Sequence, residues 1–81
     1  MSEVRKRRDF IMPVTMAQPG DVSTIVRITG NDKTRAHLHE LGLVENDSVI
    51  VIAKTGGNVI LKVKDCRIAL DMSMAGRIMV R

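Results

Sequence analysis

Two apolar stretches on either side of a pair of glycines constrain the fold more than any other feature of the chain. The stretches read DSVIVIAK and NVILKVKD, and Gly56 and Gly57 lie between them. A Gly-Gly connection between apolar alternations favours a two-residue hairpin, because the preferred turn needs positive φ at both positions. On the second stretch Val59, Leu61 and Val63 point to one side and the intervening residues to the other, which predicts one buried and one solvated face.

Three further stretches have the residue types and lengths of short strands. Residues 21–29 (DVSTIVRIT) carry Val22, Thr24, Val26 and Ile28 at every second position, which predicts a strand with these four side chains on one face. RIAL follows the hairpin, and RIMV lies near the C-terminus. A flat sheet of five short strands would leave exposed edges, so we expect a mainly β fold bent into a small barrel.

Residues 31–42 (NDKTRAHLHELG) have the pattern of a short helix that follows the first strand. Asn31 or Asp32 can cap the free N–H groups of the first turn, and Gly42 stands where a left-handed C-terminal residue is expected. Apolar residues recur at helical spacing at Ala36, Leu38 and Leu41. A helix of about three turns is too short to be stable on its own, so we expect packing to hold it.

The N-terminal segment differs in charge from the rest of the chain. The net charge is +4, four of the 13 Lys and Arg lie at positions 5–8, and Phe10 is the one aromatic residue. We expect residues 1–11 to be a basic flexible tail and residues 12–81 to be a single domain. Such a tail can touch a membrane surface or nucleic acid, although a solvated terminus is the commoner case.

Cysteine content and hydropathy indicate the compartment. Cys66 is the single cysteine, so an internal disulfide is impossible and a reducing environment is favoured. The basic start is not followed by an apolar signal segment, and no apolar run approaches the roughly 20 residues that a membrane helix needs. We therefore expect a cytoplasmic protein without direct membrane insertion.

The chain contains, in this order, the segments PVTMAQPGDVSTIVRITG, HLHELGL, SVIVIAKTGGNVILKVKDCRIAL and AGRIMV. Together they resemble the ferrous iron transport protein A (FeoA) family, from about Val14 to Val80. The resemblance implies an all-β fold, a small SH3-like β-barrel of about five strands with one short helix inserted after the first strand. It also implies a non-enzymatic accessory protein that binds and modulates FeoB, the membrane ferrous-iron transporter with a GTP-binding domain.

The loop after the predicted helix departs from the family pattern. The family commonly places Pro-Gly after Leu-Gly-Leu and one spacer residue, whereas here the spacer Val44 is followed by Glu45 and Asn46. Asn is among the few residues that tolerate positive φ. We therefore expect Asn46 to take the backbone conformation of the glycine.

The histidines of HLHELGL are weak candidates for a metal site. Residues two apart on a helix point about 160° away from each other, so His37 and His39 cannot bind one ion there. His37 and Glu40 are three apart and could touch as an ordinary surface pair. We predict no metal site in this segment.

Two other groups contain soft metal ligands. Cys66 has no CxxC or Cys/His cluster around it, so a structural or incidental role is expected. Met72 and Met74 form a Met-x-Met pair that suits copper(I), but methionines more often fill irregular gaps in a core. We predict no cofactor, and weak ferrous iron binding stays open.

Catalysis and nucleic-acid binding have little support in the sequence. It contains no nucleophile motif, no glycine-rich phosphate loop and no paired carboxylates at a telling spacing. Without aromatic residues beyond Phe10 it has no platform for stacking bases. We expect no enzyme activity and no nucleic-acid partner, although an RNA-binding barrel that uses the basic tail is one alternative.

Protein–protein interaction is the remaining function class. We predict a partner-binding site at the end of the helix, formed by Leu41, Gly42, Leu43 and Val44, because an exposed Leu43 or Val44 would offer an apolar contact. The opposite case, in which both complete the core, is equally open, as is the oligomeric state. A second alternative function is a module related to the C-terminal SH3-like domain of iron-dependent repressors.

Overall fold

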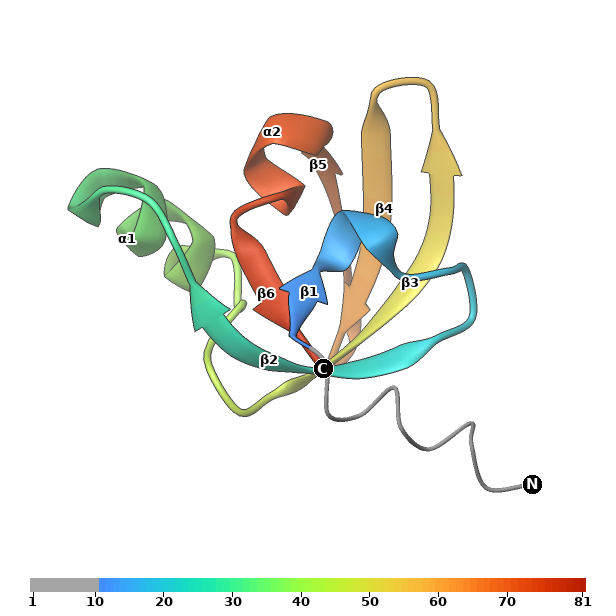
Figure 1. Ribbon diagram of the computed structural model, residues 1–81, viewed down its shortest axis with the longest axis horizontal. Coiled ribbons are helices and arrows are strands. Elements are labelled where there is room, and N and C mark those ends of the chain that lie inside the picture. Colours follow the sequence, from blue (N-terminus) through green and yellow to red (C-terminus); the bar gives the residue numbers. More distant parts are fainter. Residues whose placement is uncertain (1–10) are drawn as a thin grey trace.

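The computed structural model of the chain describes residues 11–81, which form one antiparallel sheet in the order β1-β6-β2-β3-β4-β5 (Figure 1). The strands are β1 Met12–Pro13, β2 Val22–Ile28, β3 Ser48–Thr55, β4 Asn58–Val63, β5 Cys66–Asp71 and β6 Ile78–Val80. The helices are η2 Val14–Met16, a 3-10 helix, and the α-helices α1 Asp32–Glu40 and α2 Met72–Ala75. The predicted basic tail lies outside the described residues except for Ile11.

The prediction of a mainly β fold is confirmed, but its details change. Six strands are present instead of about five, because Met12 and Pro13 pair with β6, and α1 therefore follows the second strand. The edge strands β1 and β5 are not paired with each other, so the sheet is not closed into the expected barrel. The sheet therefore stays open between β5 and the two-residue strand β1.

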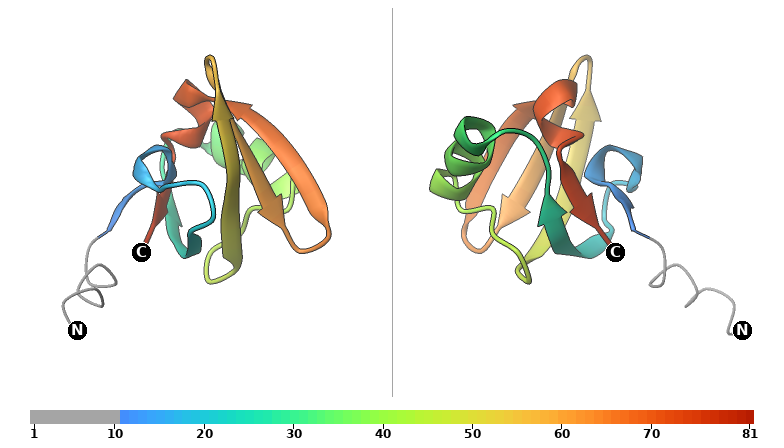
Figure 2. Two further views of the ribbon diagram at one scale, coloured as in Figure 1. Left: turned by 90° about the vertical axis from the view of Figure 1, so that its right-hand side faces the viewer. Right: turned by 60° about the vertical axis from the view of Figure 1, so that its left-hand side comes forward.

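Strand β2 belongs to both halves of the sheet. Its first part, from Val22 to Thr24, pairs with β3, and its second part, from Ile25 to Ile28, pairs with β6. The register shifts between Ile25 and Arg27, which marks a β-bulge, and a bulge bends and twists its strand. The bend turns the β1–β6–β2 half toward the β3–β4–β5 half, as the two views of Figure 2 show.

The same bulge overturns the predicted face of this strand. Ser23, Ile25 and Ile28 are buried, whereas Val22 is 67% exposed. One inserted residue changes which side chains point inward on either side of the bulge. The prediction that every second residue from Val22 to Ile28 shares one face is therefore wrong.

The β3–β4 hairpin forms as predicted. Thr55 pairs with Asn58 across the two glycines, and the three inward residues of β4, Val59, Leu61 and Val63, are buried. Gly56 has a φ of 53°, while Gly57 is outside the positive region. The turn therefore needs positive φ at its first position alone, as in a type II′ turn, and the expectation of two positive angles is wrong.

The loop after α1 uses two left-handed residues. Gly42 has a φ of 99° and ends the helix, and Asn46 has a φ of 75°, as predicted from its place in the loop. The Asn46 backbone N–H donates to the Ile25 carbonyl oxygen at 2.7 Å, and the Ile25 N–H donates to the Asp47 carbonyl oxygen at 2.9 Å. These bonds hold the loop against the centre of β2.

The backbone conformation of Asn46 leads to a stability prediction. We expect Asn46→Ala to lower the free energy of unfolding by about 1 kcal/mol, because an ordinary side chain is disfavoured at positive φ, and Asn46→Gly to leave it unchanged or raise it slightly. Urea denaturation followed by circular dichroism measures both. Equal stability of the alanine and glycine variants would contradict the prediction.

Candidate functional site

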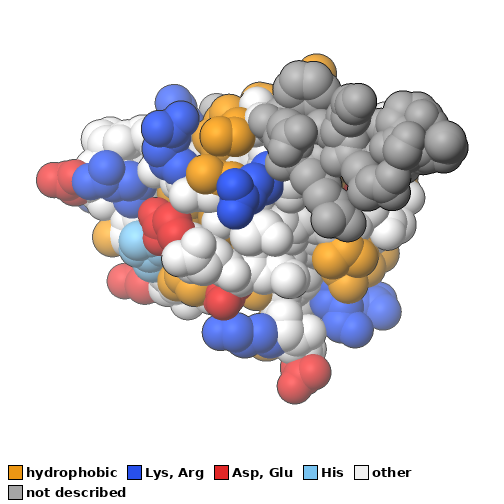
Figure 3. Space-filling view, turned by 60° about the horizontal axis from the view of Figure 1, so that its bottom comes forward, with side chains coloured by type: hydrophobic (Ala, Val, Ile, Leu, Met, Phe, Trp, Pro, Cys, Tyr) orange, Lys and Arg blue, Asp and Glu red, His pale blue; other side chains and the backbone are white. Residues whose placement is uncertain are grey.

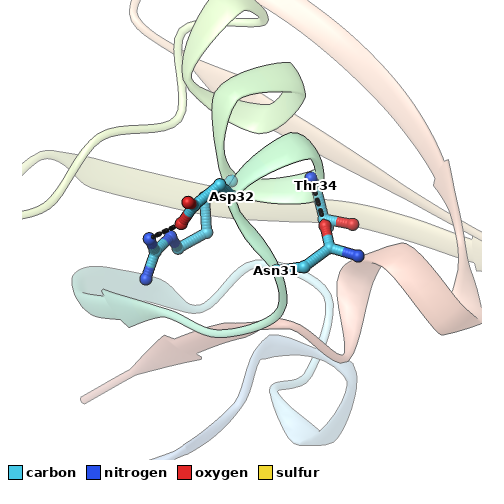
Figure 4. A network of polar contacts seen from close by, with 4 residues as sticks. Asn31, Asp32 and Thr34 are labelled. Atoms are coloured by element: carbon cyan, nitrogen blue, oxygen red, sulfur yellow. Dashed lines mark hydrogen bonds and ion pairs between the residues drawn. The ribbon is translucent and has the colours of Figure 1, made fainter.

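Helix α1 is anchored at its start by side-chain caps. The Asn31 Oδ1 accepts a hydrogen bond from the Thr34 backbone N–H at 2.8 Å, so Asn31 is the N-cap. Asp32 lies in the first turn and forms an ion pair with the Arg35 guanidinium (Figure 4). Leu38 is the buried residue of this helix. The helix is therefore held by one buried side chain and a capped first turn.

The two histidines lie on the exposed surface of α1. His39 Nε2 is 3.3 Å from Glu45 Oε1, and this contact joins the helix end to the following loop. His37 and Glu40 are also exposed, and they are not among the ion pairs found within residues 11–81. Among residues 11–81, no group of three or more His, Cys, Asp or Glu side chains is placed to hold a metal ion.

The sulfur-containing candidates are dispersed. Cys66 is exposed at the start of the edge strand β5. Met74 packs against the core, as the core interpretation predicts, whereas Met72 is 43% exposed and does not. Residues two apart on a helix point about 160° away from each other, so α2 does not bring the two thioethers together.

The predicted partner-binding residues divide into buried and reachable ones. Leu43 is completely buried and belongs to the core, and its N–H donates to the Leu38 carbonyl oxygen at 3.1 Å. Leu41, Gly42 and Val44 are half-buried, and Leu41 also packs against the core. Leu43 therefore anchors the loop to the core, and the part of this candidate site that a partner could contact consists of the other three residues.

An ion pair ties this loop to the turn between β4 and β5. Lys64 Nζ lies 3.3 Å from Asp47 Oδ2, an oxygen that is shielded from solvent and has no partner with good hydrogen-bond geometry. Lys64 has a φ of 57° in this turn, a conformation that costs free energy for a residue with a side chain. The helix-end loop and the tip of the β4–β5 hairpin thus form neighbouring parts of one surface.

Sequence reasoning missed an aliphatic surface on the outside of the β3–β4–β5 half. Its members, called the outer strip below, are Val22, Ile50, Ala53, Ile60 and Ala69. None of them packs against the core. The run VIVIA in β3 is the signal that was available, because a strand with one solvated face would alternate apolar and polar residues.

Charged side chains of both signs are interspersed over the face seen in Figure 3, and they do not form a basic stripe in this view. A basic stripe or patch is the electrostatic footprint of a nucleic-acid-binding surface. This face therefore does not suit recognition of a nucleic-acid backbone.

Within residues 11–81, no helix has the length and apolar character needed to cross a bilayer.

Comparison with known proteins identifies the family of the chain. Residues 12–81 match the FeoA domain family. The fold is similar to the crystal structure of an iron uptake regulatory protein (FeoA), with a TM-score of 0.81, 32% identity and coverage of 89% of this chain and 96% of that chain. No match was found among curated proteins.

Two further solved structures share the fold at lower identity. A FeoA-like protein from Clostridium acetobutylicum has a TM-score of 0.79 and 18% identity over 88% of this chain and 85% of that chain. A manganese-dependent transcriptional repressor in complex with manganese has a TM-score of 0.81 and 17% identity over 88% of this chain. The match spans 36% of the repressor, so the likeness concerns one part of that protein.

Proposed function

The chain belongs to the FeoA domain family, and from this premise we propose that it is an accessory protein of ferrous iron uptake that binds and modulates a FeoB-type GTP-dependent membrane transporter. The observation that carries the proposal is the family match over residues 12–81. It is supported by the 32% identity to a protein described as an iron uptake regulatory protein.

The surface of the domain favours binding over catalysis. Exposed or half-buried aliphatic side chains lie on the outer strip and at Leu41 and Val44, whereas no group of three or more candidate polar metal ligands is found among residues 11–81. An accessory protein that acts by docking needs an apolar contact surface and does not need a catalytic cluster. We therefore propose a non-enzymatic, cytoplasmic role for an SH3-like domain that begins near residue 12.

Iron is part of the proposal as the cargo of the transporter. Ferrous iron prefers nitrogen and oxygen ligands, and the closest such pair at the helix end is His39 and Glu45, 3.3 Å apart. Two ligands at an exposed position support weak binding at most. The proposal therefore assigns the iron connection to the partner.

Co-purification with the transporter tests the proposed function. We expect the tagged protein to retain the purified FeoB-type transporter from the same organism in detergent, and to change its rate of GTP hydrolysis. The measurement is made with and without ferrous iron, which separates a constitutive complex from an iron-dependent one. Absence of binding under both conditions would overturn the proposal.

The likeness to the manganese-dependent repressor supports the fold and not a repressor function. The identity is 17%, and the chain matches 36% of that protein. Binding of a purified metal-dependent repressor by this chain, combined with no binding of the transporter, would favour the repressor-related alternative.

A further inference from the structure

The strand pairing of the β3–β4–β5 half determines which side chains share its outer face. Paired residues of antiparallel strands point to the same face, and β4 buries every second side chain, so Ile60 and Lys62 point outward. Ile60 pairs with Ala53 and with Ala69, and these three form one row across the strands.

A second row lies beside the first. Lys62 pairs with Ile50 and with Arg67, and Ile50 pairs with Val22. This row therefore consists of two aliphatic residues on β2 and β3 followed by two cations on β4 and β5. The outer face is a continuous aliphatic strip with a cationic corner.

The outer strip is partly accessible. Val22 is 67% exposed, Ala69 is exposed on the edge strand, and Ile50, Ala53 and Ile60 are half-buried. Ile60 lies between two alanines, so its side chain stands above small neighbours on both sides. Figure 2 (left) shows β3, β4 and β5 with no helix in front of them and with α1 behind. A monomer gains nothing from leaving contiguous aliphatic side chains in water, so such a patch marks an interaction surface.

The cations of the corner have no acidic partner within the described part of the chain. Lys62 and Arg67 face each other across the strands, an arrangement of like charges that lowers stability. The ion pairs found among residues 11–81 involve other cations. Asp71, farther along β5, accepts a hydrogen bond from the Met74 N–H at 2.7 Å and caps α2. The corner therefore has unneutralised positive charge beside an apolar surface.

We propose that the outer strip with Lys62 and Arg67 is the surface that docks on the transporter, and that it receives an aliphatic segment flanked by at least two carboxylates. The aliphatic side chains of this segment cover Ile50 and Ile60, and its carboxylates pair with the two cations. This inference rests on the proposed function and names the contact surface within it.

Three observations favour a protein segment over other occupants. A second copy of this chain is disfavoured, because the chain carries a net charge of +4 and would bring its own cations to the contact. A membrane surface is disfavoured, because the strip has no Trp, Tyr or Phe to sit in the headgroup region. Single-stranded nucleic acid is disfavoured as well, because the strip has no aromatic side chains on which bases could stack.

Charge reversal tests the cationic corner. We expect Lys62→Glu/Arg67→Glu to weaken binding to the purified transporter about tenfold or more, with a slower association rate and a smaller dependence on salt. The matched control Arg27→Glu/Lys33→Glu makes the same change in net charge at exposed positions on β2 and α1 and should bind as the unaltered protein does. Biolayer interferometry on the full-length chain measures both rates.

A second pair of variants tests the aliphatic part. Ile60→Thr keeps a β-branched side chain on a half-buried outer position and should weaken binding about fivefold or more, whereas Met79→Thr, half-buried on the other half of the sheet, should not. Circular dichroism verifies that all four variants fold. If Ile60→Thr unfolds, the charge-reversal variant and its matched control test the proposal.

The outcomes separate this inference from the proposed function. Failure of the unaltered protein to bind the transporter overturns both, whereas unaltered binding by both Lys62→Glu/Arg67→Glu and Ile60→Thr overturns only the assignment of the surface. A dimer in sedimentation that Ile60→Thr dissociates would assign the strip to a second copy. Binding to vesicles of phosphatidylcholine and phosphatidylglycerol that is lost on charge reversal would assign it to a membrane. Either result overturns the proposal.

Discussion

Replacing Leu43 with serine is expected to lower the free energy of unfolding by about 3 to 5 kcal/mol, because the substitution leaves a cavity and buries a hydroxyl group. Leu43 is completely buried, and its neighbour Val44 is half-buried. Small domains have little stability in reserve, so this loss is a large part of the total. Urea denaturation and thermal unfolding measure it.

Val44→Ser is the matched control for this variant. It makes a similar change of polarity one residue later, at a position outside the core, and should cost no more than about 1 kcal/mol. Equal destabilisation by the two variants would contradict the burial of Leu43. The pair also separates stability from binding. If Val44→Ser folds but loses partner binding, while another folded variant keeps it, the helix end is identified as a contact.

Replacing Leu38 with alanine is expected to destabilise α1 more than the rest of the molecule. Leu38 is the buried residue of this helix, which is too short to persist without packing. We expect a loss of about 2 to 5 kcal/mol if the helix stays coupled to global unfolding. If the helix instead detaches on its own, the loss of unfolding free energy is smaller and α1 becomes selectively exposed. Hydrogen exchange of the amides of residues 32–43 distinguishes the two.

His37→Ala serves as the control on the same helix. His37 is exposed, and alanine favours the helix, so stability should stay within about 0.5 kcal/mol. Unchanged exchange of the α1 amides in Leu38→Ala would show that other contacts hold the helix.

The elements that sequence patterns predicted correctly depend on local chemistry. The β3–β4 hairpin follows from two glycines between apolar alternations, and α1 begins at a side-chain cap and ends before a left-handed glycine. Asn46 takes its positive φ for the same local reason. In each case the few residues that decide the structure are adjacent in the chain, so the pattern contains the whole cause.

The elements that it missed depend on distant partners. β1 exists because Met12 and Pro13 meet the C-terminal strand, nearly 70 positions away in sequence. The bulge in β2 arises where the strand changes partners from β3 to β6, and it reverses the expected face of Val22. The expected barrel does not close, because the edge strands β1 and β5, which are far apart in the chain, are not paired with each other.

The candidate site shows the same division most clearly. By itself, the sequence determined that Leu41 to Val44 lie at the end of a short helix. Only the tertiary structure decided that Leu43 lies in the core and that Ile50 and Ile60 share an outer face with Lys62 and Arg67. Burial and cross-strand neighbours are set by strand register and by the bend of β2, and these arise from contacts between segments that are far apart in the chain.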